Sequence, residues 1–310
     1  MIRKPQLPAM KKLPDIFRGD FIPVILGATA SGKSSLAFSI AGETDGEIVC
    51  CDSMQLYRGL DIGTAKATPE ELQQIPHHLI DILDITEKSD IFQYCDLAEK
   101  AVADILSRGK RPVFEGGSGL YIHAFLYGLD PLPADPAIRE ELNEKFDNDE
   151  HFEELCAVVR EKCPEDYAKF YPHRRKIIRA YEVFLITGQQ MTSLQSGMES
   201  RPPRPGYRQF FLVWDRAELC DRIRLRTRQM LKAGWIEEAE QLIRNGLLST
   251  PTAWQALGYS LIGEYLNGKL TYDELEERIV IATRQYARRQ VTWFRHRHPH
   301  AEPVMMPLSC

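Results

Sequence analysis

The sequence predicts an α/β protein with a phosphate-loop (P-loop) parallel-sheet core, an all-helical insertion domain and a helical C-terminal region. Strand and helix patterns alternate through the first third of the chain. A GxxxxGKS motif directly follows an apolar stretch, and a central region with helical patterns alone lies between two proline-rich segments. Alternating β and α elements indicate a parallel sheet, which binds ligands at the carboxyl ends of its strands.

The core elements are predicted from apolar periodicity and from the residues that end each pattern. They are a strand over Phe21–Leu26, a helix over Lys33–Ala41, a strand over Glu47–Cys51, a helix over Ile91–Arg108 and a strand over Arg111–Glu115. Gly27, Asp52 and Gly116 each come just after a strand. We therefore expect these three residues to converge on one edge of the sheet.

Beyond about residue 130 the pattern is helical until a strand returns at Gln209–Val213. The predicted helices are Ala137–Asp147, Glu150–Lys162 and Arg174–Thr187, followed after the strand by Glu218–Lys232, Ile236–Asn245 and a long helix from Tyr272 to about Phe294. The expected division is a flexible N-terminal arm at 1–20, a P-loop core at 21–130 and 206–310, and a helical insertion at 131–205.

Composition is that of a soluble globular protein, with 44% hydrophobic and 27% charged residues. No apolar run approaches the ~20 residues that span a bilayer, so we expect no membrane partner. The first 20 residues lack the apolar core of a signal peptide. The seven cysteines show no metal-ligand spacing, and Cys50 and Cys51 are adjacent in a predicted strand. These features indicate reduced, buried thiols and a cytoplasmic protein.

The formal net charge of −5 argues against a nucleic-acid partner, but the distribution of charge argues for one. Basic residues concentrate in His173–Arg179, Arg222–Arg228 and Arg284–His298. Local patches, rather than net charge, decide binding to a phosphate backbone. The same clusters are also compatible with solvated arginines on helix surfaces.

The GxxxxGKS motif, Gly27–Ser34, predicts a phosphate site. Backbone N–H groups of such a loop surround phosphate oxygens, Lys33 neutralises their charge, and the Ser34 hydroxyl holds a magnesium ion. Nucleotide hydrolases add a carboxylate at the end of a hydrophobic strand. Glu115 is one candidate, on a short strand. Asp52 is better placed, and its local sequence leaves three roles open: magnesium ligand, general base or strand-end cap.

Several segments closely resemble the tRNA dimethylallyltransferases (tRNA isopentenyltransferases). They are Gly27–Ser34, Asp52–Lys66, Pro76–Asp81, Gly116–Tyr121, Arg175–Val183, Gln255–Tyr259 and Thr283–Arg295. The resemblance runs from about residue 22 to about residue 295, and Asp52–Lys66 is its most specific segment. No Cys/His finger follows the core, which indicates the bacterial type.

The resemblance implies transfer of a dimethylallyl group from dimethylallyl diphosphate to N6 of the tRNA adenosine 3′ of the anticodon, position 37, with release of diphosphate. The tRNAs concerned would be those that read codons beginning with U. The implied partners are the tRNA anticodon stem-loop and dimethylallyl diphosphate, with Mg²⁺ as cofactor. The helical insertion at 131–205 would be the tRNA-binding insertion. We expect a monomer.

The resemblance also implies the residues of each site. Asp52, Thr29 and Arg226 would be catalytic, with Asp52 as the general base. The diphosphate would lie on Gly27, Ala28, Thr29, Ala30, Ser31, Gly32, Lys33, Ser34 and Arg226, and Ser34 would hold the metal. The tRNA would contact Asp52, Ser53, Met54, Gln55, Ser118, Arg139, Arg175, Lys176, Arg179, Gln255, Gly258, Tyr259, Arg288, Arg289 and Arg295. Trp293 and Phe294 are assigned to the core.

The sequence departs from the family pattern at a few positions. Ala28 replaces a proline, Ser34 and Ser118 replace threonines, and Ser260 lacks a basic side chain. Glu115 stands where an apolar residue is usual and brings a negative charge toward the diphosphate. Three other functions stay open: prenylation of free adenine nucleotides, an ATP-dependent kinase or hydrolase, and a non-catalytic RNA-binding protein.

Overall fold

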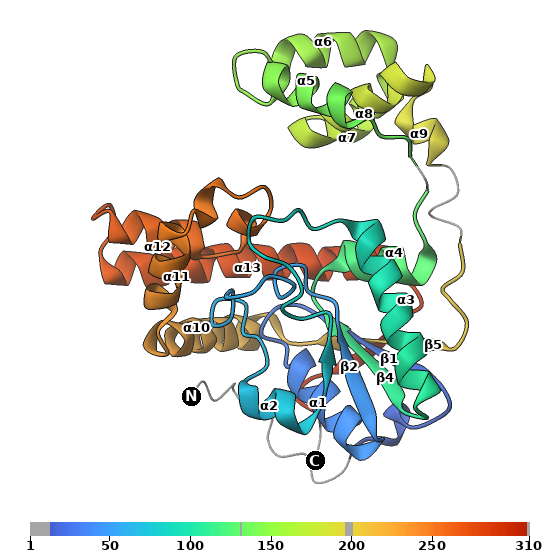
Figure 1. The fold of residues 1–310 in the computed structure, drawn as a ribbon, viewed down its shortest axis with the longest axis vertical. Coiled ribbons are helices and arrows are strands. Elements are labelled where there is room, and N and C mark those ends of the chain that lie inside the picture. Colours follow the sequence, from blue (N-terminus) through green and yellow to red (C-terminus); the bar gives the residue numbers. More distant parts are fainter. Residues whose placement is uncertain (1–12, 131, 196–200, 309–310) are drawn as a thin grey trace. The chain divides into compact units, whose positions relative to one another are not determined.

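The computed structural model describes residues 13–130, 132–195 and 201–308. The chain divides into two compact units, residues 1–126 with 204–310 and residues 127–203 (Figure 1). The second unit overlaps the expected insertion, 131–205. Within the described ranges, no helix combines the length and the apolar character needed to cross a membrane.

The first unit is built on a six-stranded sheet in which every strand pair is parallel. The strand order is β3-β2-β4-β1-β5-β6. The strands are β1 (Ile22–Gly27), β2 (Gly46–Cys50), β3 (His77–His78), β4 (Arg111–Gly116), β5 (Tyr207–Val213) and β6 (Glu302–Met305). Helices cover a parallel sheet on both faces, which explains why the central strands read as apolar runs.

The pairing register of the strands determines which strand ends lie side by side. Glu115 of β4 is level with Ile25 of β1 on one side and with Cys50 of β2 on the other. The carboxyl ends of these three strands therefore lie side by side, and the loops that follow them start from one edge of the sheet.

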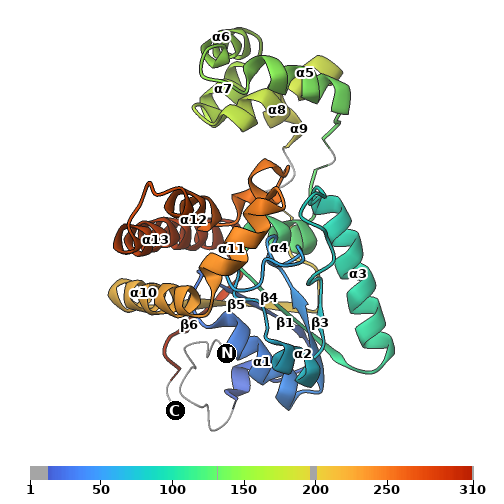
Figure 2. The same ribbon diagram turned by 60° about the vertical axis from the view of Figure 1, so that its left-hand side comes forward.

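The helices between the strands cover opposite faces of the sheet. They are α1 (Lys33–Glu43), α2 (Pro69–Gln74), α3 (Ile91–Ser107) and α4 (Gly119–Tyr127). Both α1 and α3 pack on β4, and they lie on its two sides in Figure 2. Right-handed crossovers require this, because the chain moves across the sheet in opposite directions through the two helices.

The segment before β1 belongs to the core. Leu13 and Phe17 are buried, and the ring of Phe17 packs edge-on against Phe210 with 4.8 Å between centroids. The 3₁₀ helix η1 (Asp15–Phe17) carries this contact. Within the arm expected over 1–20, Leu13 and Phe17 therefore pack in the core, while residues 18–20 are exposed. Residues 1–12 lie outside the described part of the chain.

The C-terminal region of the first unit is helical. It comprises α10 (Arg216–Lys232), α11 (Trp235–Arg244), the 3₁₀ helices η2 (Leu247–Ser249) and η3 (Ala253–Gln255), α12 (Tyr259–Leu266) and α13 (Tyr272–Arg297). Asp215 caps α10 by accepting from the N–H groups of Ala217 and Glu218, and Thr271 and Glu274 form a capping box on α13. The chain then returns to the sheet as β6.

The second unit is all helical. Its helices are α5 (Pro136–Phe146), α6 (Phe152–Lys162), α7 (Pro164–Phe170), α8 (Arg174–Thr187) and α9 (Met191–Leu194). They enclose a separate apolar cluster that includes Leu155, Val159 and Ile177. The predicted fold class, a parallel α/β core with helical insertion and helical C-terminal region, is confirmed.

A buried ion pair at the start of β2 predicts acid sensitivity. Glu47 is 2% exposed, accepts a 2.8 Å hydrogen bond from Arg108, and lies 2.7 Å from His78 Nε2. The hydrogen bond from Arg108 lowers the pKa of Glu47 from 4.5 to about 2. The folded state thus favours the charged form, so this stabilisation is present above about pH 4.5 and is lost as pH falls toward 2.

Glu47→Gln should lower the free energy of unfolding at pH 7 by about 2–3 kcal/mol and flatten its decline between about pH 4.5 and 2. Urea denaturation across that pH range measures both effects. Asp96→Asn is the control, because the Asp96 carboxylate is exposed on α3 and pairs with exposed Lys100. An equally steep decline for Glu47→Gln and wild type would contradict the assignment.

Candidate active site

The carboxyl ends of β1, β2 and β4 border a cavity of about 340 Å³ in the first unit. Its walls come from the P-loop, the loop after β2, the glycine turn after β4, and the helices α10 and α13. Residues from all three strand ends line it, as the sequence predicts: Lys33, Ser34, Asp52, Glu115, Gly116 and Gly117. Its apolar surface includes Met54, Ile223, Met230 and Leu257.

Side chains from outside the P-loop stabilise its conformation. Gly32 adopts a left-handed conformation at the start of α1 (φ 90°), which favours glycine. The carbonyl oxygen of Ser31 accepts from the Trp214 indole at 2.9 Å, and that of Ala30 accepts from Arg222 Nε at 2.9 Å. These bonds satisfy outward-facing carbonyl groups and leave the loop preorganised for an anion.

Two cations lie beside the loop, Lys33, which is buried, and Arg226, which is partly buried. Lys33 Nζ donates to the Ala28 carbonyl oxygen at 2.9 Å, and burial lowers the pKa of Lys33 to about 8 while Glu115 acts in the opposite direction. Burial also lowers the pKa of Arg226, with Asp52 and Glu115 opposing the shift. Both cations are therefore desolvated beside carboxylates, an arrangement that an anionic ligand would further stabilise.

Asp52 follows β2 and is fixed by the glycine turn after β4. Gly116 packs so closely on Cys51 that a Cβ would overlap the Cys51 carbonyl group. That same carbonyl oxygen accepts from the Ser118 N–H at 3.1 Å, and the Ser118 hydroxyl accepts from the Ser53 N–H at 2.9 Å. One Asp52 carboxylate oxygen accepts from the Met54 N–H at 3.0 Å. Asp52 is half-buried and lines the cavity.

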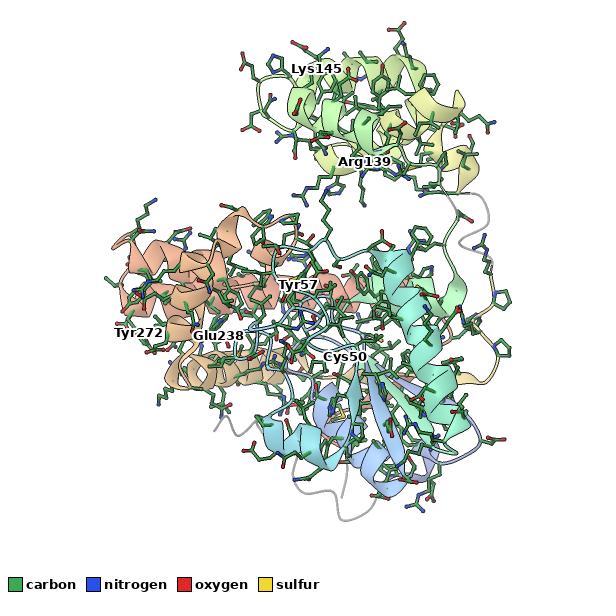
Figure 3. The ribbon with its side chains drawn as sticks, in the orientation of Figure 1. Cys50, Tyr57, Arg139, Lys145, Glu238 and Tyr272 are labelled. Carbon is green, nitrogen blue, oxygen red and sulfur yellow. The ribbon has the colours of Figure 1, made fainter. Side chains whose placement is uncertain are left out.

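Glu238 on α11 anchors the loop that follows Asp52, a role that the sequence did not suggest. Its carboxylate accepts from the N–H groups of Asp61 (3.2 Å), Ile62 (2.7 Å) and Gly63 (3.1 Å) and from the Tyr259 hydroxyl at 2.6 Å. Figure 3 labels Glu238 among the C-terminal helices. Since Gly63 lines the cavity, Glu238 ties one cavity wall to the helices.

Gln290 on α13 joins two of the strand-end loops and was likewise not predicted as a site residue. Its side-chain oxygen accepts from the Thr29 N–H at 2.8 Å, and its side-chain nitrogen donates to the Gly117 carbonyl oxygen at 2.9 Å. Gln290 is 6% exposed. The P-loop and the glycine turn therefore keep their separation through one side chain from a distant helix.

Ser34 and Glu115 form a pair of oxygen donors at the base of the cavity. The Ser34 hydroxyl donates to Glu115 Oε2 at 3.1 Å, and both residues line the cavity. Hydroxyl and carboxylate oxygens are the ligand types that Mg²⁺ prefers. The residues present therefore fit a magnesium ion.

The predicted tRNA-binding residues of the first unit occupy different settings. Gln255 and Arg289 line the cavity together with Asp52, Ser53, Met54 and Gln55. Arg288 and Arg295 are exposed on α13. Tyr259, directly after Gly258, is fully buried with its hydroxyl on Glu238, so a contact of this side chain with RNA would require it to leave the core.

In the insertion, Arg175 and Lys176 are exposed on α8. Arg139 and Arg179 instead form ion pairs with Glu182, whose side chain is fully buried. Glu182 also accepts from the Asp135 N–H at 3.1 Å. Both arginines therefore compensate a buried charge, in addition to the RNA contact predicted for them. Figure 3 shows Arg139 and Lys145 on opposite sides of the insertion.

Trp293 and Phe294, near the end of α13, differ in how far they are buried. Phe294 is 1% exposed, as its assignment to the core predicts. Trp293 is only partly buried, and it packs against Gly119, where a Cβ would collide with the indole. The structure thus places only Phe294 fully in the core.

Sequence comparison identifies relatives along almost the whole chain. A family model described as IPP transferase matches residues 55–297. The tRNA dimethylallyltransferase of Methylococcus capsulatus is 43% identical over 280 residues, which cover 88% of this chain and 89% of that protein.

Structure comparison gives the same result. The full-length tRNA isopentenylpyrophosphate transferase of Bacillus halodurans matches with a TM-score of 0.66 and 35% identity, covering 93% of this chain and 90% of that one. A eukaryotic dimethylallyltransferase acting on tRNA matches with a TM-score of 0.74 and 26% identity, covering 93% and 74% of the two chains.

The Gln290 bridge predicts a stability loss. Gln290→Leu should lower the free energy of unfolding by about 1–3 kcal/mol, because the buried groups of Thr29 and Gly117 lose their partner. Urea denaturation measures it. Gln285→Leu, on the exposed side of the same helix, is the matched control and should change stability by less than about 0.5 kcal/mol. Equal losses in the two variants would show that the bridge contributes nothing specific.

Proposed function

The chain belongs to the tRNA dimethylallyltransferase (IPP transferase) family, and we propose that it transfers a dimethylallyl group from dimethylallyl diphosphate to N6 of an adenosine in tRNA. The adenosine is the one 3′ of the anticodon, position 37, in tRNAs that read codons beginning with U. Magnesium is the cofactor, and the protein acts as a cytoplasmic monomer.

One observation carries the proposal: the Asp52 carboxylate lines the same cavity as Lys33 and Arg226. A phosphate-binding loop alone does not distinguish between the different classes of P-loop enzyme. A carboxylate at the end of β2, which β4 separates from the P-loop strand, adds a proton acceptor across a cavity with apolar side chains in its walls.

Asp52 would act on the nucleophile. The lone pair of the exocyclic amine is delocalised into the adenine ring, so the amine reacts poorly by itself. As the bond between N6 and C1 of the dimethylallyl group forms, the C1–O bond breaks and diphosphate leaves with the bonding electrons. Asp52 orients the N–H and takes the proton, a contribution of typically ~10²–10⁴-fold.

The P-loop would act on the leaving group. Its backbone N–H groups, the Thr29 hydroxyl, Lys33 and Arg226 stabilise the charge that grows on diphosphate, and they need no rearrangement to do so. Ser34 would hold the magnesium ion, which supplies electrostatic stabilisation of diphosphate when bound.

The base must leave the stacked anticodon loop to enter the cavity. Ser53, Met54 and Gln55 would surround it, with Ser118 holding Ser53 in place. Exposed basic residues on α8 and α13, namely Arg175, Lys176, Arg288 and Arg295, would bind the RNA backbone, which dominates affinity for nucleic acid.

Mass spectrometry of nucleosides tests the activity. We expect tRNA incubated with the protein, Mg²⁺ and dimethylallyl diphosphate to contain N6-dimethylallyl adenosine next to the anticodon. Free adenine nucleotides should stay unmodified. Release or transfer of phosphate from radiolabelled ATP at an enzymatic rate would instead favour a kinase or hydrolase and contradict the proposal.

Asp52→Asn should slow transfer by about 10²–10⁴-fold, because the amide cannot accept the proton, while tRNA affinity stays within about twofold. Single-turnover kinetics and filter binding measure the two effects. Asp45→Asn is the matched control, because Asp45 lies just before the same strand, exposed and paired with Lys110. A wild-type rate for Asp52→Asn would remove Asp52 as the base.

The insertion predicts a change in salt dependence. Replacing both Arg175 and Lys176 by Gln should weaken tRNA binding and reduce the slope of log affinity against log salt concentration by about 1–2. Titrations at several salt concentrations measure the slope.

The control double variant replaces Lys145 and Lys162 by Gln, which removes the same charge from exposed positions of the same unit. We expect its slope to match that of wild type. Equal slopes for both double variants would show that Arg175 and Lys176 make no particular contact with RNA.

A further inference from the structure

Glu115 is a buried carboxylate in a cavity that is expected to bind a diphosphate. It is 6% exposed, and its position in β4 is level with Ile25 of the P-loop strand. The negative charge of Glu115 should by itself repel diphosphate. Diphosphate binding therefore requires positive charge that offsets this carboxylate.

The side chains around it indicate which group compensates. Within the described cavity lining, Glu115 and Asp52 bring two carboxylates, while buried Lys33 and partly buried Arg226 bring two cations. These charges balance before any ligand enters. A diphosphate then adds negative charge that exposed Arg289 on the rim offsets only in part, which favours entry of a divalent cation together with it.

The position of Glu115 suits that cation. Its Oε2 is 3.1 Å from the Ser34 hydroxyl oxygen, and β4 is the direct neighbour of the P-loop strand β1. In P-loop nucleotide hydrolases a P-loop hydroxyl and a carboxylate at a strand end hold Mg²⁺ in the same manner. Both oxygen donors, the Ser34 hydroxyl and the Glu115 carboxylate, are present here. The sequence of β4 lacks the long apolar run that usually precedes such a carboxylate.

We propose that Glu115, with Ser34, forms the magnesium site of this chain and makes diphosphate binding depend strongly on the divalent cation. This rests on the proposed function only in taking diphosphate as the ligand. The carboxylate repels diphosphate when the cation is absent and attracts the cation that accompanies it, so the two ligands bind cooperatively. Such coupling is reciprocal, and each ligand raises the affinity for the other by the same factor.

Calorimetric titration with inorganic pyrophosphate measures the coupling, as the ratio of its affinity with saturating Mg²⁺ to its affinity with EDTA. Glu115→Gln keeps the size of the side chain and an acceptor for Ser34 but removes the charge. We expect it to bind pyrophosphate about 3–10-fold more tightly than wild type in EDTA, and the coupling ratio to fall at least tenfold. Pyrophosphate–Mg²⁺ complexes form equally in solution for every variant and cancel in this comparison.

Binding of Mn²⁺, followed by electron paramagnetic resonance in the presence of pyrophosphate, gives a second readout and should weaken at least tenfold in Glu115→Gln. Glu115→Val should behave alike, and Asp96→Asn, which removes one exposed charge from α3, should behave as wild type. Tighter binding in EDTA cannot result from misfolding, so the sign of the effect separates charge from damage.

The pyrophosphate titrations test the role of Glu115 in the magnesium site separately from the proposed function. If wild type binds pyrophosphate and the coupling ratio is the same in Glu115→Gln, Glu115 has no part in the metal site and the proposed function stands. If wild type binds no pyrophosphate with or without Mg²⁺, the diphosphate site itself is wrong, and both proposals fall.

Discussion

The close contact between the ends of β2 and β4 is the constraint on which the rest of the site depends. Gly116 leaves room for the Cys51 carbonyl group, and that carbonyl oxygen accepts from Ser118. A larger residue at 116 would push the strand ends apart. Because β4 also pairs with β1, the same contact sets the distance from Asp52 to the P-loop.

The helices hold the loops that the sheet brings together. Gln290 on α13 bonds to Thr29 and to Gly117, and Glu238 on α11 binds three consecutive N–H groups of the loop after Asp52. Loops at the carboxyl edge of a parallel sheet are otherwise free to move. In this protein, side chains from the C-terminal helices hold the loops that form the walls of the cavity.

The sequence predicts the residues that strand order brings together, and it misses those that tertiary packing selects. Gly27, Asp52 and Gly116 could be placed at one edge because each is predicted to follow a strand. Gln290 and Glu238 could not, since their partners are far away in sequence and both read as ordinary helix residues. The Arg179–Glu182 pair has the i, i+3 spacing of a helix pair, but nothing in the sequence shows that Glu182 is buried or that Arg139 also reaches it.

Strand order also explains how a P-loop can serve a reaction in which phosphate is the leaving group. Asp52 follows β2, and β4 lies between β2 and the P-loop strand β1. Two strand spacings, about 10 Å at the backbone, therefore separate the strand that precedes Asp52 from the P-loop strand. This separation, with Met54, Ile223 and Met230 on the cavity walls, suits the proposed transfer of an apolar five-carbon group from a diphosphate to an amine.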